Sequence, residues 1–183
     1  MNKKSIKFTS SNIISLRDEI CKTKTRYWKI IKSENIMSNK EKKAGVGSGF
    51  DLKVLHNQIL QMSEKLIKVK LMLNAINNGI TKFDYDEAKK THYYRIFKAC
   101  ELKEQLAHWE EILKKHTLNP ALKAKAGAKG LGKSETFTSA KIASIKSSLQ
   151  KEINKIDAEI AKFNNETELE ITDDDDFTSF IAA

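Results

Sequence analysis

Residues 52–76 read LKVLHNQILQMSEKLIKVKLMLNAI, and this stretch decides the fold. Its apolar side chains recur at alternating intervals of 3 and 4 residues, the spacing of a coiled-coil seam: Leu52, Leu55, Ile59, Met62, Leu66, Val69, Leu73 and Ile76. Asp51 stands where an N-cap is needed, and Asn77-Asn78-Gly79 supplies residues that tolerate the left-handed conformation of a C-cap. The stretch therefore predicts one long amphipathic helix.

A second seam with the same spacing follows a short connection: Ala99, Leu102, Leu106, Trp109 and Leu113. We expect its helix to run from near Asp84 to about His116. Because the connection between the two helices is short, they are expected to pack as an antiparallel hairpin.

Two further helices are expected on either side of this hairpin. The first runs from Ser11 to Ile36, with Ser11 or Asn12 as its N-cap, and its apolar positions are Ile13, Leu16, Ile20, Tyr27 and Ile31. The second begins at Thr138 or Ser139, ends near Phe163, and has the apolar face Ile142, Ile145, Leu149, Ile153, Ile156, Ile160 and Phe163. The content of 7 Gly and 1 Pro in 183 residues disfavours a turn-rich β fold.

The predicted fold is therefore all-α: an elongated antiparallel helical hairpin (coiled coil) with flanking helices and a disordered acidic C-terminal tail. We divide the chain into four parts. A basic N-terminal helix (1–37) is followed by a flexible glycine-containing linker (38–50). The helical hairpin with a third helix and a basic loop at 117–137 (51–163) comes next, and an acidic tail (164–183) ends the sequence. Pro120 after Asn119 marks the break before the basic loop.

Charge is distributed unevenly along the chain. The net charge is +9, but residues 164–183 contain seven acids and no base, so the preceding 163 residues hold all 33 bases against 17 acids. Thirty of the 33 bases are lysine, and abundant Lys, Ile and Asn are typical of an AT-rich genome, such as that of a phage or mobile element. Lysine lacks the planar fork with which arginine recognises guanine, so any contact with DNA or RNA is expected to be electrostatic and non-specific.

Two lysine-rich segments are the candidates for nucleic-acid contact. The segment KTKTRYWKIIK at residues 22–32 combines cations with aromatic rings, which suits phosphates and stacked bases. The predicted contact residues are Lys22, Lys24, Arg26, Trp28 and Lys29 here, and Lys123, Lys125, Lys129 and Lys133 in the basic loop. The alternative interpretation is that Trp28, like Tyr93 and Tyr94 in a similar later segment, belongs to a helical core.

The C-terminal sequence EITDDDDFTSFIAA is the most suggestive for partner binding. Its acids and apolar residues are Asp173, Asp174, Asp175, Asp176, Phe177, Phe180 and Ile181. The segment resembles the acidic, aromatic-ended tails of bacterial and phage single-stranded-DNA-binding proteins and also short clamp-binding peptides. This resemblance implies a protein partner with a basic, pocketed surface. The alternative is a solubilising tail that folds back on the basic body.

A second resemblance is architectural. A helix with SLRD, a helix ending LNAINNG and a helix beginning DYDEA follow one another over residues 11–113. This order resembles the septicolysin-like family of small helical bacterial proteins. The resemblance implies a helical hairpin and assigns no functional residue.

The sequence shows no recognisable set of catalytic residues. Residues 127–134, GAKGLGKS, match the phosphate-loop pattern, but LNPALKAKA before them is no strand, so we interpret them as a basic loop. His56, His92, His108 and His116 are isolated, as are Cys21 and Cys100, and no metal or cofactor is expected. Two cysteines, no signal-peptide core and no 18-residue apolar run favour a reduced, cytoplasmic setting without membrane insertion.

We therefore expect a non-enzymatic accessory or adaptor protein that contacts nucleic acid through its lysine-rich segments and a protein partner through its tail. Self-association into a homo-oligomer is also expected from the coiled-coil seams. The alternative is a structural or scaffolding coiled-coil protein, such as a virion or assembly component, that binds no nucleic acid.

Overall fold

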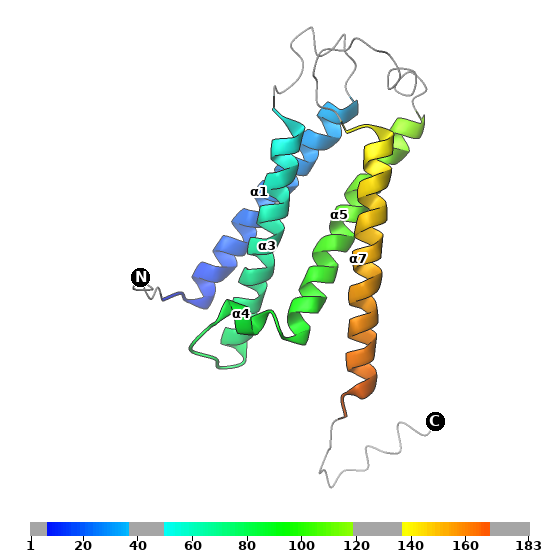
Figure 1. The fold of residues 1–183 in the computed structure, drawn as a ribbon. Coiled ribbons are helices and arrows are strands. Elements are labelled where there is room, and N and C mark those ends of the chain that lie inside the picture. Colours follow the sequence, from blue (N-terminus) through cyan, green and yellow to red (C-terminus); the bar gives the residue numbers. More distant parts are fainter. Residues whose placement is uncertain (1–6, 37–49, 119–136, 169–183) are drawn as a thin grey trace, which may run out of the picture.

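A computed structural model describes residues 7–36, 50–118 and 137–168. These residues form five helices and no strand: α1 (Ser10–Ile36), α3 (Leu52–Asn77), α4 (Tyr85–Ala88), α5 (His92–Leu118) and α7 (Ser139–Glu166). Figure 1 shows the four long helices running alternately up and down, with the short α4 at one end between α3 and α5. The all-α prediction is confirmed.

The ends of α3 follow the sequence signals. The Asp51 carboxylate accepts hydrogen bonds from the backbone N–H groups of Lys53 and Val54, at 2.8 and 3.2 Å. These bonds satisfy two of the donors that a helix start leaves unpaired. At the other end Gly79 has φ +72°, a conformation that a residue without Cβ adopts at little cost.

Two predicted helix starts were wrong in detail. α1 is capped by Thr9 rather than by Ser11 or Asn12: Thr9 Oγ1 accepts from the Asn12 N–H, and Asn12 Oδ1 accepts in return from Thr9. The helix expected from Asp84 is two helices, because Asp84 caps only the single turn of α4 and a turn at 89–91 precedes α5. Hydrogen bonds from a side chain to a nearby backbone N–H set where a helix begins, and the spacing of apolar residues does not reveal them.

The helices pack as two close antiparallel pairs, α1 with α3 and α5 with α7. Ion pairs fix the α5–α7 register: Arg95 lies 3.1 Å from Glu159, and Glu110 lies 3.2 Å from Lys146 near the other end of the pair. α3 and α5 also run antiparallel and contact each other, as the predicted hairpin requires, but less closely than either pair. α5 occupies the centre, since it contacts α1, α3 and α7.

The main core lies where the C-terminal halves of α1 and α5 meet the N-terminal halves of α3 and α7. Its buried members come from all four long helices and from Phe137, which precedes the N-cap of α7: Trp28, Ile31, Leu52, Leu55, Ile59, Trp109, Ile112, Phe137 and Ile142. Five seam positions of α3 are buried as predicted, while Met62, Leu73 and Ile76 are half-buried. α3 also buries residues that the seam omits, namely Ser63, Ile67, Leu71 and Ala75, because it packs against both α1 and α5.

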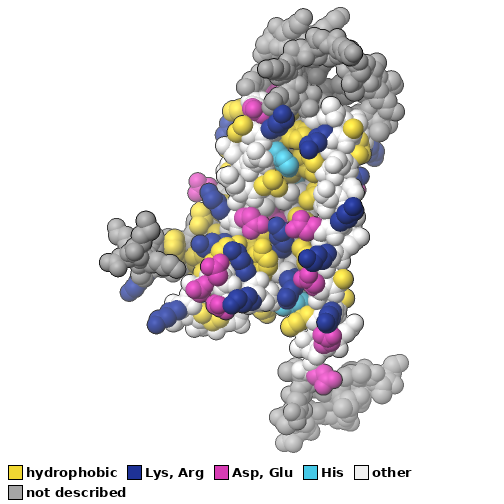
Figure 2. Space-filling view, in the orientation of Figure 1, with side chains coloured by type: hydrophobic (Ala, Val, Ile, Leu, Met, Phe, Trp, Pro, Cys, Tyr) yellow, Lys and Arg dark blue, Asp and Glu magenta, His cyan; other side chains and the backbone are white. Residues whose placement is uncertain are grey.

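None of the helices in the described part of the chain is long and apolar enough to cross a membrane. On the face shown in Figure 2, Lys and Arg side chains lie interspersed with Asp and Glu. Many of these form ion pairs between helices, as Lys103 does with Asp157 at 2.9 Å.

Candidate functional site

The five residues predicted as a nucleic-acid contact on α1 divide into two groups. Lys22, Arg26 and Lys29 are exposed, whereas Lys24 and Trp28 are buried, with 2% and 1% of their surfaces accessible. The assignment of Lys24 and Trp28 to a nucleic-acid contact was therefore wrong. A side chain inside the bundle cannot approach a phosphate or a base from solvent.

Lys24 is buried because two carboxylates of α5 neutralise it. Its Nζ lies 2.6 Å from Glu101 Oε2 and 2.7 Å from Glu104 Oε2, and Lys70 of α3 lies 2.9 Å from the other Glu101 oxygen. Burial lowers the pKa of Lys24, but the hydrogen bonds and charges of the two carboxylates outweigh it and raise the pKa above its ordinary value. This buried ion network joins α1, α3 and α5, and holds Lys24 charged.

Trp28 belongs to an aromatic cluster at the centre of the core. Its ring centroid lies 5.3 Å from that of Trp109, which in turn lies 5.1 Å from His56 and 4.8 Å from Phe137. The near-perpendicular rings are in the edge-to-face arrangement that aromatic pairs favour. The interpretation of Trp28 as a core residue, which the sequence left open, is the correct one.

The His56 imidazole packs within this cluster. Burial, and after it the charge of Lys141, lowers the pKa of the His56 imidazole below its ordinary value. Within the described residues, no group of three or more His, Cys, Asp or Glu side chains is placed to hold a metal ion.

The exposed cations of α1 form one face. Lys22, Arg26 and Lys29 are spaced by 4 and 3 residues, so they are neighbours on the helix surface. Residues 20–33 of α1 contain no acid, and the other two cations of this stretch are occupied, Lys24 by the buried network and Lys32 by Glu111 of α5. We call Lys22, Arg26 and Lys29 the basic face; none of them pairs with a described carboxylate.

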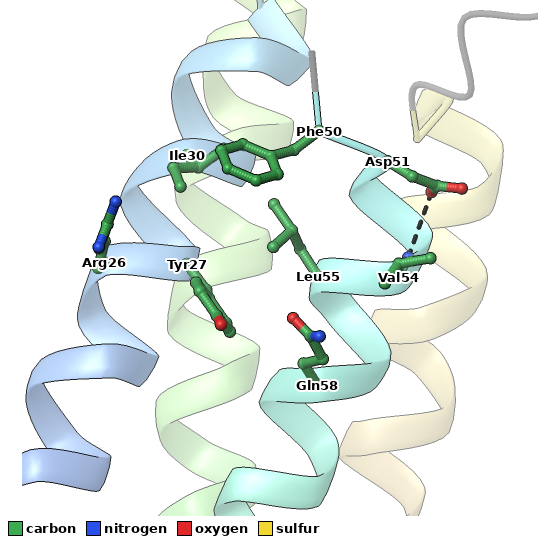
Figure 3. Close-up of a pocket in the computed structure, with 8 residues that line it drawn as sticks. All are labelled: Arg26, Tyr27, Ile30, Phe50, Asp51, Val54, Leu55 and Gln58. Carbon is green, nitrogen blue, oxygen red and sulfur yellow. Dashed lines mark hydrogen bonds between the residues drawn. The ribbon is translucent and has the colours of Figure 1, made fainter. Parts of the chain in front are cut away.

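A groove lies beside this basic face, between α1 and the start of α3 (Figure 3). Its volume is about 320 Å³, and its lining is mostly apolar: Arg26, Tyr27, Ile30, Phe50, Asp51, Val54, Leu55 and Gln58. Phe50 and Val54 remain about half exposed, at 52% and 50%. Figure 3 shows Arg26 on the α1 side and Asp51 on the α3 side, so the groove has a cation at one edge and a carboxylate at the other.

This groove was not predicted from the sequence. Phe50 and Val54 are apolar residues outside the α3 seam, and this is the feature of the sequence that could have indicated an apolar surface here. An exposed apolar patch with polar edges can bind an apolar side chain and orient its polar neighbours. No nucleophile–base pair lies among the residues that line the groove.

The remaining predicted site residues lie outside the described part of the chain. They are Lys123, Lys125, Lys129 and Lys133 of the basic segment, the 127–134 pattern, and Asp173, Asp174, Asp175, Asp176, Phe177, Phe180 and Ile181 of the tail. Their assignments stay predictions.

Comparison with known proteins gives no match: no protein-family model fits the chain, and neither a curated protein nor a solved structure is similar to it. The resemblances to the septicolysin-like family and to acidic tails therefore stay predictions.

The buried ion network makes stability depend on pH in the acid range. The His108 imidazole, 3.7 Å away, and then Lys24 lower the pKa of Glu104 to about 2, although burial opposes them. A carboxyl whose folded pKa lies below its unfolded value of 4.5 stabilises the fold above pH 4.5, and this contribution is lost as pH falls from 4.5 toward 2. Because the Glu104 side chain is 43% exposed, solvent screening reduces the contribution.

We expect Glu104→Gln to lower the free energy of unfolding at pH 7 and to reduce its decline between pH 4.5 and 2, measured by urea unfolding at each pH. Glu166→Gln, in the last turn of α7, is the control and should leave the pH profile unchanged. An unaltered profile for Glu104→Gln would contradict the network. Glu111, whose pKa is also about 2 because of Lys115 and Lys32, accounts for part of the remaining decline.

Proposed function

We propose that this chain is a non-enzymatic accessory or adaptor protein that contacts nucleic acid without sequence preference and a protein partner through its C-terminal tail. The observation that carries the nucleic-acid half is the basic face. Lys22, Arg26 and Lys29 are exposed, adjacent and without a described carboxylate partner, in a stretch of α1 that has no acid.

The contrast with α5 supports this proposal. Three of the five cations of α5 face a carboxylate of a neighbouring helix: Lys98 faces Glu64 at 2.8 Å, Arg95 faces Glu159 and Lys103 faces Asp157. A cation already paired contributes little to phosphate binding, because the new contact must replace the existing one. The basic face needs no such exchange.

The tail half rests on sequence. Four consecutive aspartates, followed by Phe177 and Phe180, combine long-range attraction to a basic surface with apolar anchors. Acidic groups of this kind accelerate and orient association, while buried aromatic side chains supply most of the affinity.

We expect replacement of the basic face by Lys22→Gln, Arg26→Gln and Lys29→Gln to weaken binding to a labelled DNA duplex and to flatten its salt dependence. Each lost phosphate contact lowers the slope of log K against log salt by about 0.9, so the triple variant should lose about 2 to 3 units of slope. Fluorescence anisotropy of the full chain measures this salt dependence between roughly 50 and 300 mM NaCl, a range that brackets physiological ionic strength.

A matched control removes the same charge from α7: Lys141→Gln, Lys151→Gln and Lys155→Gln. These exposed lysines share their helix with Glu152, Asp157 and Glu159, so their loss should change the slope much less. Equal flattening by both triple variants would show that total charge, and not the basic face, determines binding. If the wild-type chain fails to bind DNA even at about 50 mM NaCl, the lowest salt concentration tested, the scaffolding function is favoured instead.

A further inference from the structure

The groove between α1 and α3 matches the C-terminal segment in chemistry. Its floor is apolar, with Phe50 and Val54 half exposed, and Arg26 stands at one edge. The segment at 173–181 offers acids followed by two aromatic residues and Ile181. A phenyl ring in the groove would cover exposed apolar surface, while the preceding aspartates could pair with Arg26 and its neighbours on the basic face.

Asp51 at the opposite edge gives the groove a direction. Its carboxylate caps α3 and would repel a run of aspartates laid against the α3 side. The favourable orientation places the acids over α1 and the aromatic residues toward Val54 and Leu55. A segment with acids before its aromatic residues can meet both conditions at once.

The groove is too far from the end of α7 for the chain to lay its whole run of aspartates beside it. Ile145 and Leu149 of α7 pack against the same core as Leu55 and Ile30, so the groove is level with these two residues. From there α7 runs a further 17 to 21 residues to Glu166, about 26–32 Å at 1.5 Å per residue. Fully extended, the seven residues from Glu166 to Asp173 span at most about 25 Å and the ten residues to Asp176 at most about 36 Å, so only the last aspartates of the run come level with the groove.

The width of the molecule adds to this distance. α7 packs chiefly on α5, and α5 lies between it and the α1–α3 pair (Figure 1). Neighbouring helix axes are about 8–10 Å apart. A chain leaving α7 must therefore also cross the width of the bundle to reach the groove. The complete run of aspartates therefore lies beside a groove more readily on another molecule than on its own.

We propose that the groove between α1 and α3 binds the C-terminal segment, residues 173–181, of a second copy of this chain. Asp173–Asp176 lie along the basic face, and Phe177 or Phe180 fills the groove. Two copies placed antiparallel bring the end of each α7 to the groove of the other, so a closed dimer with two equivalent contacts forms. The inference rests on the tail half of the proposed function, whose partner it identifies, and not on nucleic-acid binding.

Charge exchange between two variants of the full chain tests this contact. Arg26→Glu alone, and Asp174→Lys with Asp175→Lys and Asp176→Lys alone, should each weaken self-association about tenfold or more, because like charges then meet at the contact. In an equimolar mixture the acidic tail of the first variant meets the intact Arg26 of the second, and the basic tail of the second meets Glu at position 26 of the first. The mixture should therefore recover association. Sedimentation velocity over a range of protein concentrations measures all three samples.

Arg17→Glu is the matched control on α1. It reverses a partly exposed arginine outside the groove and should leave self-association within about twofold of the wild type. Phe177→Ala with Phe180→Ala should abolish association without reducing the helical signal in far-UV circular dichroism. Val54→Asp, at a half-exposed groove position, should do the same.

A wild-type chain that stays monomeric at every concentration would overturn the inference, as would a mixture of the charge variants that fails to associate better than either alone. Neither result touches nucleic-acid binding, which the salt dependence of DNA binding tests separately. Conversely, a chain that does not bind DNA but self-associates, with association restored in the mixture of charge variants, would overturn only the proposal of nucleic-acid binding.

Discussion

Glu101→Gln should lower the free energy of unfolding by about 3–5 kcal/mol, measured by urea unfolding at pH 7, because it leaves a buried cation without its closest counter-charge. Glu101 is 2% exposed and accepts from both Lys24 and Lys70. The amide keeps the shape of the side chain and removes the charge. Lys24 then retains only Glu104, which is itself partly exposed.

Two further variants make this prediction specific to the buried network. Glu159→Gln breaks a partly exposed ion pair with Arg95 and should cost about 0–1 kcal/mol. The double variant Lys24→Met, Glu101→Leu removes both buried charges and should recover most of the loss, since replacing a buried ion pair with apolar residues is often neutral or stabilising. Equal losses for Glu101→Gln and Glu159→Gln would contradict the burial of the network.

Trp109→Ala should destabilise the fold by a similar amount, about 3–5 kcal/mol, because it removes the ring at the centre of the core. Trp109 is fully buried and contacts Trp28, His56 and Phe137, so its loss leaves a void bordered by α1, α3 and the start of α7. Thermal or urea unfolding followed by far-UV circular dichroism measures the change.

Tyr93→Ala, at an exposed position of the same helix, is the control and should change stability by less than about 0.5 kcal/mol. Trp109→Phe, which keeps part of the ring volume, should fall between the two. If Trp109→Ala costs no more than Tyr93→Ala, the aromatic cluster does not hold the four helices together.

Helix positions could be predicted from the sequence because they depend on local signals. Asp51 and Gly79 mark the ends of α3, and the fourth helix begins after Thr138, whose hydroxyl accepts from the Lys141 N–H. Helix pairing could not be predicted equally well. The heptad seam gives one buried face for α3, whereas the helix packs on two sides, and no local pattern says that α1 is its closest neighbour.

The candidate site was predicted only in part, for the same reason. Lys22, Lys24 and Lys29 look alike in the sequence, yet Lys24 alone faces α5, where Glu101 and Glu104 neutralise it. Glu101 falls between seam positions Ala99 and Leu102 and is therefore expected at the surface. Which charged residue is buried depends on the partner helix, and that information lies 77 residues away in the chain.

That separation has a consequence for how the chain is made. When α1 and α3 have been synthesised, Lys24 still lacks both carboxylates, and the side of Trp28 that meets Trp109 has nothing to pack against. At about 5–20 residues per second, the 27 residues from the end of α3 at Asn77 to Glu104 take about 1–5 s to appear. For that interval a nascent α1–α3 pair carries an unneutralised cation on its future inner face. That charge should keep the half-finished bundle from closing on itself or on a neighbouring chain before α5 arrives.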